Sequence, residues 1–382
     1  MSRPSRPRVL VVGSGTEFIS GVSHHTRYLA EALDERAEVS VLLMRKLIPR
    51  FLYPGRERVG EKLTGAEYRP SMPVFDGVDW FLLPSLARAL RFMRRQRPEC
   101  VVFQWWTGAV LHSYLPLALC ARASGTRILI EMHEMQDTGE AAMAPARAYV
   151  NRFARLLMDM ADGFIVHSEH DRIALAENFP IGRRPVRTLR MGPYSHYEFT
   201  HAPPAREAPP EACNYLFFGT IRPYKGLEDL VRAFELLSDD GDPGWLTVVG
   251  ETWEGWQEPL RLIESSRCRE RITLVNRYVT DEEASGWFAG ADVVALPYHR
   301  SSASGPLHMT MDAGLPVVLT DVGGLREAVD GYEGAVLVRE RDPRALSDGL
   351  RAAQTLRGRR HAVANGWDGA AEAVLDLFAE VR

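Results

Sequence analysis

The sequence FFGTIRPYKG, residues 217–226, places two positive charges between a strand and a helix. Its first residues predict the end of a buried strand at Gly219, and LEDLVRAFELL, after Gly226, has the periodicity of an amphipathic helix. Arg222 and Lys225 lie in between, where the helix dipole makes extra cations mildly unfavourable. A bound anion explains this placement, and a diphosphate offers oxygens to both cations. A solvated loop with surface cations is the alternative.

Short apolar runs alternate with helical patterns along the rest of the chain. The first half contains RVLVVG, EVSVLLM, CVVFQWW, RILIEMH, GFIVHS and VRTLRMG, and the second contains NYLFFG, WLTVVG, RITLVN, DVVALPY, PVVLTDVG and AVLVRE. Strands that alternate with helices predict parallel sheets with helices on both faces. The runs lack an alternation of apolar and polar residues, which is typical of strands covered on both sides.

A proline-rich segment without periodicity, residues 193–213, separates the two halves and indicates a linker. We therefore predict an α/β protein of two Rossmann-like, doubly wound domains, residues 1–192 and 214–364, that face each other across a cleft. Ligands of such sheets bind beyond the carboxyl ends of the strands, so the cleft is the expected active site.

The composition excludes several classes of protein. The 382 residues include 46 Lys and Arg against 50 Asp and Glu, a net charge of −4, which argues against general nucleic-acid binding. Four scattered cysteines without CxxC spacing indicate reduced thiols. The first apolar run is too short for a signal peptide, and residues 101–121 are interrupted by Gln104, His112 and Pro116, which disfavours a membrane span. We expect a cytoplasmic protein.

The glycines of GSGTEFISG, residues 13–21, resemble a dinucleotide fingerprint only in part. Phe18 stands where the third glycine is required, and the second strand ends in Arg45 and Lys46 instead of an acidic residue. We therefore expect no nicotinamide cofactor, and no other cofactor is indicated. The glycines form a tight turn, or Gly21 at the helix start lets a substrate approach the backbone.

A second anion-binding segment is predicted in SASGPL. Ser304 and Pro306 are typical of a helix start, with Gly305 between them and Leu307 in the first turn. We predict that backbone N–H groups from Ser304 to Leu307 bind a second face of the same phosphate. An ordinary helix cap gives the same pattern and is the alternative.

The histidines and paired aspartates do not predict a metal site. His133 ends the strand RILIEMHE and is a candidate for the active site or a structural histidine. His167 and His170 have the spacing of metal ligands, but no third ligand is identifiable, so we expect structural or surface side chains. SDDGDPG, residues 238–244, has the composition of a turn.

Residues 45–62 mix six Lys and Arg with two Glu and contain Phe51 and Tyr53. A solvated loop is one interpretation. The other is a surface for an anionic or lipid-linked acceptor, with peripheral contact to the inner membrane face.

The second half of the chain resembles the donor-binding domain of GT-B glycosyltransferases of family 4, also called group 1. The motifs are FFGTIRPYKGLEDLVRAF, WLTVVGE, NRYVTDEEASGWFAGADVVALPY and AGLPVVLTDVGGLREAV, in that order. In the first half, ISGVSHHTRYLAEAL and EMHE match the family's glycine loop and active-site histidine more weakly. The family also implies that a helix at about residues 365–382 crosses back onto the first domain.

The resemblance implies a role for each matching residue. Arg222 and Lys225, after the turn at Gly219, hold the diphosphate of a nucleotide sugar, and Tyr278 and Val279 frame the base. In the first half, the resemblance places Gly21 near the phosphates and His133 near the transferred sugar. The activity implied is a retaining, metal-independent transfer of the sugar to a hydroxyl group of a glycan, glycolipid or small molecule.

The sequence departs from the family at one motif. The family often carries Glu-x7-Glu, and those positions are Ser301 and Met309 in this chain. Contacts to the ribose and the sugar hydroxyls are therefore expected from other groups. Two alternatives remain open, a nucleotide-sugar epimerase of the same fold and a non-catalytic nucleotide-sugar-binding protein.

Overall fold

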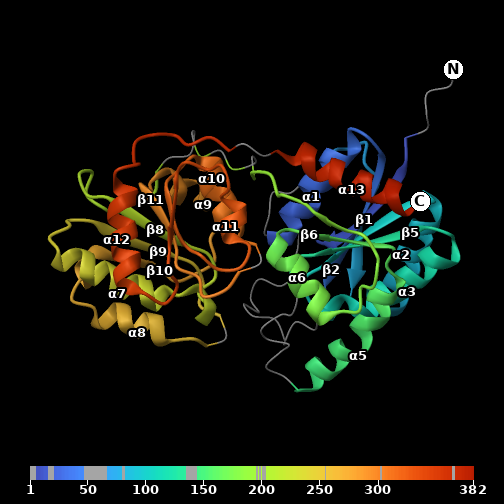
Figure 1. Ribbon diagram of the computed structural model, residues 1–382, viewed down its shortest axis with the longest axis horizontal. Coiled ribbons are helices and arrows are strands. Elements are labelled where there is room, and N and C mark those ends of the chain that lie inside the picture. Colours follow the sequence, from blue (N-terminus) through green and yellow to red (C-terminus); the bar gives the residue numbers. More distant parts are fainter. Residues whose placement is uncertain are drawn as a thin grey trace. The chain divides into compact units, whose positions relative to one another are not determined.

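The computed structural model shows two compact units, Met1–Met191 with Gly366–Arg382, called unit 1, and Gly192–Asn365, called unit 2 (Figure 1). The residues that the structure describes are 6–15, 21–46, 67–79, 82–134, 144–194, 197, 199, 204–253, 255–301, 303–363 and 366–382. Each unit is a parallel sheet covered by helices, which confirms the predicted α/β class with two Rossmann-like domains.

Unit 1 contains a seven-stranded parallel sheet of order β3-β2-β1-β4-β5-β6-β7. Its strands are β1 Arg8–Ser14, β2 Glu38–Lys46, β3 Val74–Asp79, β4 Cys100–Trp105, β5 Arg127–Met132, β6 Gly163–Val166 and β7 Val186–Thr188. Strand β3 was not among the predicted strands, and its residues VFDGVD combine two aspartates with a glycine. This composition is tolerated because β3 lies at the edge of the sheet and pairs only with β2.

Helices cover both faces of this sheet, as the unalternating strands predicted. The helices are α1 Gly21–Asp34, α2 Leu82–Gln96, α3 Leu111–Ala123, α5 Ala144–Met160, α6 Glu169–Asn178 and α13 Trp367–Val381. Leu10 and Val12 of β1 pack in the core with α2, α3 and α5. Val9 and Val11 point to the other face and pack with α1 and α13. Both faces of β1 are therefore buried.

Unit 2 contains a six-stranded parallel sheet of order β10-β9-β8-β11-β12-β13. Its strands are β8 Asn214–Phe218, β9 Trp245–Val249, β10 Ile272–Val275, β11 Val293–Leu296, β12 Val317–Thr320 and β13 Ala335–Val338. Its helices are α7 Leu227–Asp239, α8 Glu258–Ser265, α9 Asp281–Ala289, α10 Gly305–Ala313, α11 Leu325–Ala328 and α12 Pro343–Gln354. All six strands fall on the predicted apolar runs.

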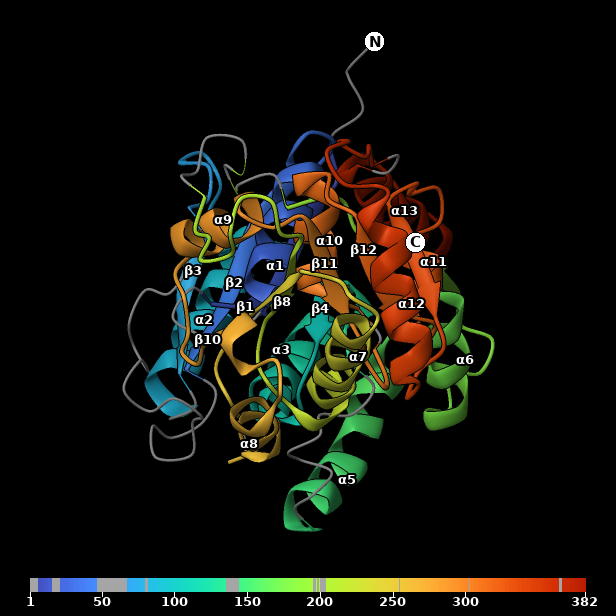
Figure 2. The ribbon, with the colours of Figure 1, turned by 90° about the vertical axis from the view of Figure 1, so that its left-hand side faces the viewer.

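The helices of unit 2 also lie on both faces of their sheet. Helices α7 and α12 pack side by side over one face, as Figure 2 shows. Phe217 of β8 points into that core, whereas the next residue, Phe218, contacts Phe288 of α9 on the opposite face. The two faces of β8 thus hold different helices in place.

Part of the predicted linker is folded onto unit 2. Arg206 Nη1 donates to Asp292 Oδ2 at 2.9 Å and to the Gly290 carbonyl at 3.0 Å. The N–H of Ala205 donates to the Gly286 carbonyl at 2.8 Å. This segment is therefore anchored to α9 and the loop that follows it.

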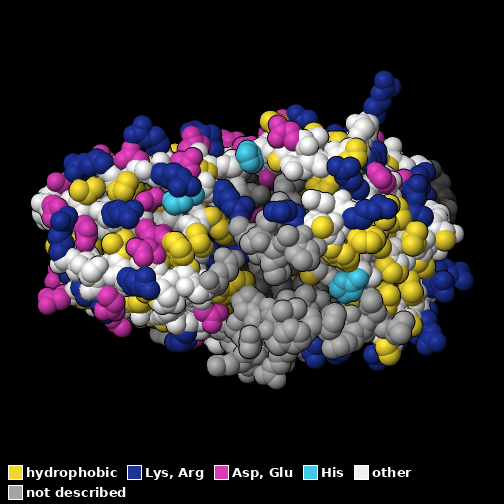
Figure 3. Space-filling model, turned by 90° about the horizontal axis from the view of Figure 1, so that it is seen from below, with side chains coloured by type: hydrophobic (Ala, Val, Ile, Leu, Met, Phe, Trp, Pro, Cys, Tyr) yellow, Lys and Arg dark blue, Asp and Glu magenta, His cyan; other side chains and the backbone are white. Residues whose placement is uncertain are grey.

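The surfaces of the two units differ from each other in side-chain type on the face shown in Figure 3. Hydrophobic side chains gather over unit 1, on the right. Leu119 of α3 and Phe153 and Leu156 of α5 are among the exposed large hydrophobic residues of unit 1. Positive and negative side chains are mixed over unit 2. Among the described residues, no helix combines the length and the apolar character needed to span a membrane.

Candidate functional site

The order of the strands locates the ligand edge of each sheet. The order reverses between β1 and β4 in unit 1 and between β8 and β11 in unit 2. Ligands of open parallel sheets bind beyond the carboxyl ends of the strands at such a switch point. In unit 2 the loops that follow β8 and β11 hold most of the predicted donor-binding residues.

Glycine lets these two loops touch. Gly226 has a φ of 65°, and a Cβ atom there would lie 2.0 Å from the Pro297 carbonyl oxygen. The N–H of His299 donates to the Tyr224 carbonyl at 2.8 Å, and its ring lies 2.8 Å from an Asp229 carboxylate oxygen. The position after Lys225 therefore requires a residue without a side chain, which fixes the loop of the two predicted cations.

Gly219 is equally constrained, since its φ is 119°. A Cβ atom added to Gly250 would lie 1.8 Å from the Gly219 carbonyl oxygen. A Cβ atom added to Gly219 would lie 3.4 Å from the Pro306 side chain. The ends of β8 and β9 and the start of α10 thus approach one another closely at this edge of the sheet.

Three cations surround Tyr224. Lys225 is only 9% exposed, and its Nζ lies 5.4 Å from the Tyr224 ring centroid and 3.8 Å from that of Tyr298. The guanidinium carbon of Arg222 lies 5.5 Å from the Tyr224 ring, and that of Arg300 lies 4.8 Å from it. Arg300 was not among the predicted donor-binding residues. Its position, just beyond the strand that borders the switch point, is the signal that identifies it.

The side chain of Ser304 caps the start of α10. Ser304 Oγ accepts from the N–H of Leu307 at 3.2 Å, and the Ser304 carbonyl accepts from the same group at 3.1 Å. Pro306 has no N–H. The prediction that the N–H groups from Ser304 to Leu307 bind phosphate is therefore corrected at these two positions, and Ser304 and Gly305 carry the other N–H groups of this turn.

The two positions that lack the family's glutamates serve the local fold. Ser301 Oγ donates to the Ala303 carbonyl at 3.0 Å, and the Ser301 carbonyl accepts from Gly324 at 3.2 Å. A Cβ atom at Gly323 would lie 1.8 Å from the Ser301 oxygen. Met309 is buried in α10. Neither side chain can accept hydrogen bonds as a carboxylate does.

Tyr278 and Val279 lie between β10 and α9, at the carboxyl edge of the same sheet. Val279 is buried, and the Tyr278 carbonyl accepts from Arg277 at 3.1 Å. Thr280 and Glu283 form a capping box that starts α9 directly after this pair. The cap therefore fixes the backbone of both residues.

In unit 1, α1 begins at Gly21, as predicted. No described atom lies within 4 Å of a Cβ added to Gly21, so the approach to the backbone here is open on the side of the described residues. Ser23 Oγ donates to the Gly15 carbonyl at 2.8 Å and ties the first turn of α1 to the end of β1.

His133 directly follows β5, and its N–H donates to the Trp105 carbonyl at 2.8 Å. Its ring belongs to a cluster that we call the His/Glu cluster, which consists of His25, Glu131, His133 and His167. Glu131 Oε1 lies 2.7 Å from His25 Nε2 and 3.8 Å from His167 Nε2, and Oε2 lies 3.6 Å from His133 Nε2.

The structure supplies neighbours of His167 that could act as further metal ligands and that were not identifiable from the sequence. His170, its neighbour in the predicted pair, is exposed on α6 and is not a member of the cluster. The partners are instead His25, Glu131 and His133, which lie far from His167 in the sequence but meet it at the carboxyl ends of β5 and β6. Only tertiary structure brings these residues together.

Burial controls the protonation of this cluster. Burial lowers the pKa of His133, and it holds the pKa of His167 well below the ordinary value for histidine. Burial also opposes ionisation of Glu131, but electrostatic attraction and hydrogen bonding to the His25 and His133 rings outweigh it and hold the pKa of this carboxyl well below its usual range. The cluster therefore contains a buried carboxylate beside two imidazoles, those of His133 and His167, that favour the neutral form.

The turn predicted at residues 238–244 is confirmed from Asp240 onward, whereas residues 238 and 239 belong to the end of α7. Gly241 has a φ of 90°, and Asp240 ends α7 and lies 2.8 Å from Arg351 and 3.1 Å from Arg344. These arginines neutralise Asp240, so the turn has a structural explanation.

Comparison with known families gives the same division of the chain. A model described as "Glycosyl transferases group 1" matches residues 212–355, and one described as "Glycosyl transferase 4-like domain" matches residues 20–192. The chain belongs to the group 1 glycosyltransferases. The resemblance stated from the motifs is thereby confirmed, and most of this glycosyltransferase is covered by the two models.

Individual relatives and structures agree. A D-inositol 3-phosphate glycosyltransferase of Streptomyces avermitilis is 28% identical over 72% of this chain and 68% of that protein. Sucrose-phosphate synthase of Thermosynechococcus elongatus superposes with a TM-score of 0.66 at 19% identity and covers 98% of this chain and 96% of its own. Alr3699/HepE of Anabaena, solved in complex with UDP, gives 0.61 at 15% identity and covers 98% and 100%. These structures share the GT-B fold with this glycosyltransferase.

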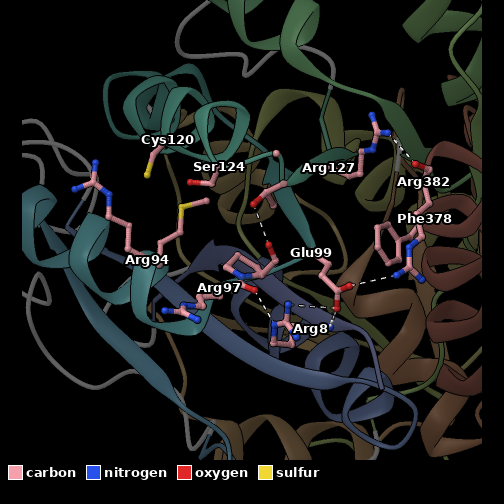
Figure 4. A pocket seen from close by; sticks show the side chains of 13 residues that line it. Arg8, Arg94, Arg97, Glu99, Cys120, Ser124, Arg127, Phe378 and Arg382 are labelled. Atoms are coloured by element: carbon pink, nitrogen blue, oxygen red, sulfur yellow. Dashed lines mark hydrogen bonds and ion pairs between the residues drawn. The ribbon is translucent and has the colours of Figure 1, made fainter. Parts of the chain in front are cut away.

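A hollow of about 460 Å³ in unit 1 of the glycosyltransferase lies at the opposite edge of the sheet (Figure 4). It borders the amino ends of β1, β4 and β5, and Arg8 and Arg382 at its wall both face Glu99, at 3.7 and 3.4 Å. Arg127 lies 3.4 Å from Asp162. Because ligands bind at the carboxyl edge, and because these cations have carboxylate partners, we assign no part of the sugar transfer to this hollow.

Proposed function

We propose that this glycosyltransferase transfers a sugar from a nucleoside-diphosphate sugar to a hydroxyl acceptor and retains the anomeric configuration. The main support is the convergence of Arg222 and Lys225 at the switch point of unit 2, on a loop that Gly226 holds against the loop after β11. A diphosphate is the part of such a donor that needs two cations.

The donor would lie along the carboxyl edge of unit 2. Arg222 and Lys225 bind the diphosphate, and the N–H groups of Ser304 and Gly305 at the start of α10 add neutral donors. Tyr278 and Val279 frame the base. For unit 1, we propose Gly21 as a further contact of the phosphates, as the family resemblance implies.

The cations also stabilise the transition state. When the glycosidic bond breaks, its electron pair goes to the β-phosphate oxygen, and the two cations neutralise this charge. The acceptor hydroxyl attacks the anomeric carbon from the same face, and its proton passes to the leaving phosphate oxygen. No protein nucleophile is consumed. His133 would donate a hydrogen bond to the transferred sugar and hold it in position.

The comparisons support the donor and suggest an acceptor. UDP-containing complexes exist for fold relatives, among them Alr3699/HepE of Anabaena with UDP and glucose. The Streptomyces relative is named for D-inositol 3-phosphate. We therefore propose a nucleotide sugar as donor, and a polyol or sugar phosphate is the first acceptor to test beside glycans and lipid-linked sugars.

We propose that transfer needs no metal ion at the diphosphate, because Arg222 and Lys225 supply the positive charge that magnesium provides in other transferases. Binding of nucleoside diphosphate and transfer should persist in EDTA. A complete loss that magnesium or manganese restores would contradict this part of the proposal.

The decisive experiment is a thermal-shift screen against nucleoside diphosphates and their sugars, because a ligand that binds the folded state raises its apparent stability. The best donor is then incubated with and without acceptors. Release of nucleoside diphosphate with formation of a glycoside supports the transferase. Conversion of the donor without an acceptor indicates the epimerase alternative, and binding without any reaction indicates the non-catalytic one.

The location of the protein stays a prediction. We propose a cytoplasmic enzyme with peripheral membrane contact through residues 45–62. Residues 47–62 of this segment lie outside the described part of the chain. Partition with anionic vesicles, compared with neutral ones, tests the contact.

A further inference from the structure

The His/Glu cluster of unit 1 has the composition of a metal centre. One ligand atom of each member lies within 4.8 Å of those of the other members, and the side chains of His25, Glu131 and His167 are at most 3% exposed. We propose that this cluster binds one divalent transition-metal ion, with zinc as the best-suited ion. The cluster shares His133 with the proposed sugar site, but metal binding can be measured without sugar transfer.

The spacing of the ligand atoms fits a small ion. Zinc bonds to nitrogen and oxygen are about 2.0–2.1 Å, so neighbouring ligands of a tetrahedral site lie about 3.4 Å apart. Glu131 lies 3.6 Å from His133 and 3.8 Å from His167. Small side-chain movements close these distances. The 2.7 Å contact between His25 and Glu131 is a hydrogen bond, which an entering ion would replace.

The orientation of the rings turns lone pairs toward the centre. His167 Nδ1 lies 3.3 Å from the Leu189 carbonyl, which only accepts, so this nitrogen bears the proton. In the neutral ring, Nε2 then presents a lone pair to Glu131. Within the described part of the chain, neither this atom nor His133 Nε2 has a hydrogen-bond partner. Acceptors that face one another repel, and a cation between them converts this repulsion into attraction.

A second layer of hydrogen bonds holds the ligands in place. Gln104 Nε2 donates to Glu131 Oε2 at 2.9 Å, and Thr26 Oγ1 donates to Gln104 Oε1 at 2.5 Å. The Leu189 carbonyl orients His167 in the same way. Metal-binding histidines and carboxylates in proteins are oriented by such outer hydrogen bonds, which fix the tautomer and the ring position.

A buried proton is the main rival occupant. A proton shared by His25 and Glu131 explains their 2.7 Å contact. It leaves the Nε2 atoms of His133 and His167 unpaired, at 3.6 and 3.8 Å from the carboxylate. An ion satisfies all three rings at once, so the geometry favours the ion.

The ligand types select the metal. Imidazole suits zinc, copper, iron and nickel, whereas magnesium and calcium prefer oxygen ligands. Three imidazoles with one carboxylate therefore favour a transition metal over magnesium or calcium, and zinc, which commonly binds four such ligands in a tetrahedron, is the ion we test first. With Nε2 of His133 on the ion, the ring proton must lie on Nδ1. The ion would thus fix the tautomer of His133 without entering the transfer reaction.

The test uses the intact protein, stripped of metal with a strong chelator and reloaded. Equilibrium dialysis against Zn²⁺ measures the stoichiometry, and Co²⁺ reports the coordination by its visible d–d absorption. We expect one ion per chain, a rise in melting temperature with Zn²⁺, and the intense absorption of four-coordinate Co²⁺. A folded wild-type protein that binds neither ion overturns the proposal and leaves the shared proton as occupant.

Two variants remove ligands while keeping the shape of the cluster. In His167→Asn the amide nitrogen can still donate to the Leu189 carbonyl, but no atom replaces Nε2. Glu131→Gln removes the charge. Each should weaken Zn²⁺ binding at least about 10-fold, since loss of even an outer partner weakens metal affinity by about 10–100-fold. His170→Ala, on exposed α6, is the matched control and should bind as the wild type does.

Undiminished binding by both variants would place the ion elsewhere and overturn the proposal. If the variants fail to fold, X-ray absorption on the Zn²⁺-loaded wild type replaces them. A first shell with the multiple scattering of about three imidazoles supports the cluster, and a shell of oxygen alone refutes it.

Discussion

The two units have the same kind of sheet but fill its ligand edge differently. In unit 2 the edge carries Arg222, Lys225 and Arg300 on loops that glycines hold together. In unit 1 the buried His/Glu cluster lies at the corresponding edge. The edge of unit 2 therefore suits reversible binding of an anionic ligand, whereas the buried side chains of unit 1 suit a cluster whose geometry is fixed.

The difference shows that the same sheet topology can carry a ligand-binding edge in one unit and a rigid cluster of side chains in the other. The ammonium of Lys225 is nearly buried, and burial of a charge is unfavourable unless it is compensated. The face of the Tyr298 ring at 3.8 Å supplies part of the compensation. A bound diphosphate would supply more, so unit 2 gains by taking up its ligand.

The largest expected effect comes from Gly226→Ala, which disrupts the contact between the loops after β8 and β11 of unit 2. The new Cβ meets the Pro297 oxygen at 2.0 Å, and the residue keeps a φ of 65°. Backbone strain and overpacking together should lower the free energy of unfolding by about 2–5 kcal/mol. The loop should also shift, so nucleoside diphosphate binding should be lost. Urea unfolding and calorimetry measure the two effects.

Gly241→Ala is the control for Gly226→Ala. Its φ is 90°, but nothing lies within 4 Å of the added Cβ. It should show only the strain of about 1–2 kcal/mol and normal binding. Equal effects of the two substitutions would mean that the contact between the loops does not matter.

The next largest effect is expected for a substitution in unit 1. His133→Ala should lower turnover about 10²-fold, the scale for one preorganised polar group. Affinity for nucleoside diphosphate should stay nearly unchanged, because the diphosphate belongs to unit 2. Turnover, affinity and melting temperature are measured on the same variant. Normal turnover in a folded variant would remove His133 from the site, and a joint loss of affinity and stability would indicate a structural histidine.

Removal of one cation from unit 2 should have a smaller but clear effect. Arg222→Ala or Lys225→Met should weaken nucleoside diphosphate binding by about 1.5–3 kcal/mol, the value of a hydrogen bond to a charged group. The fold should survive, since Met preserves the apolar stem of Lys225. Unchanged affinity by calorimetry in both variants would refute the diphosphate assignment.

The smallest effect is expected for Arg300→Ala. This side chain is exposed, so solvent and salt screen its charge, and the loss should be about 0.2–1 kcal/mol. The loss should shrink as salt is added. A loss as large as that of Lys225→Met would identify Arg300 as a third direct ligand of the diphosphate, which would sharpen the picture of unit 2.

The fold was predictable from local patterns. The strands of unit 2 coincide with apolar runs because strands buried on both faces are apolar at every position. The edge strand β3 was missed because exposure on one side permits the polar residues of VFDGVD. Gly219 and Gly226 were recognisable beside Arg222 and Lys225, since a turn after a strand has a local signature.

The sequence by itself determined the α/β class, the two parallel sheets and the segment with paired cations, because strand burial, helix periodicity and turn chemistry are written in neighbouring residues. Tertiary structure decided the rest. His25 and Glu131 are 106 positions apart and meet at 2.7 Å only because α1, which carries His25, follows β1 at the edge of the sheet where β5 also ends. Likewise, Arg300 joins Lys225 through the adjacency of β8 and β11. Such contacts depend on the order of the strands, which no local stretch of sequence records.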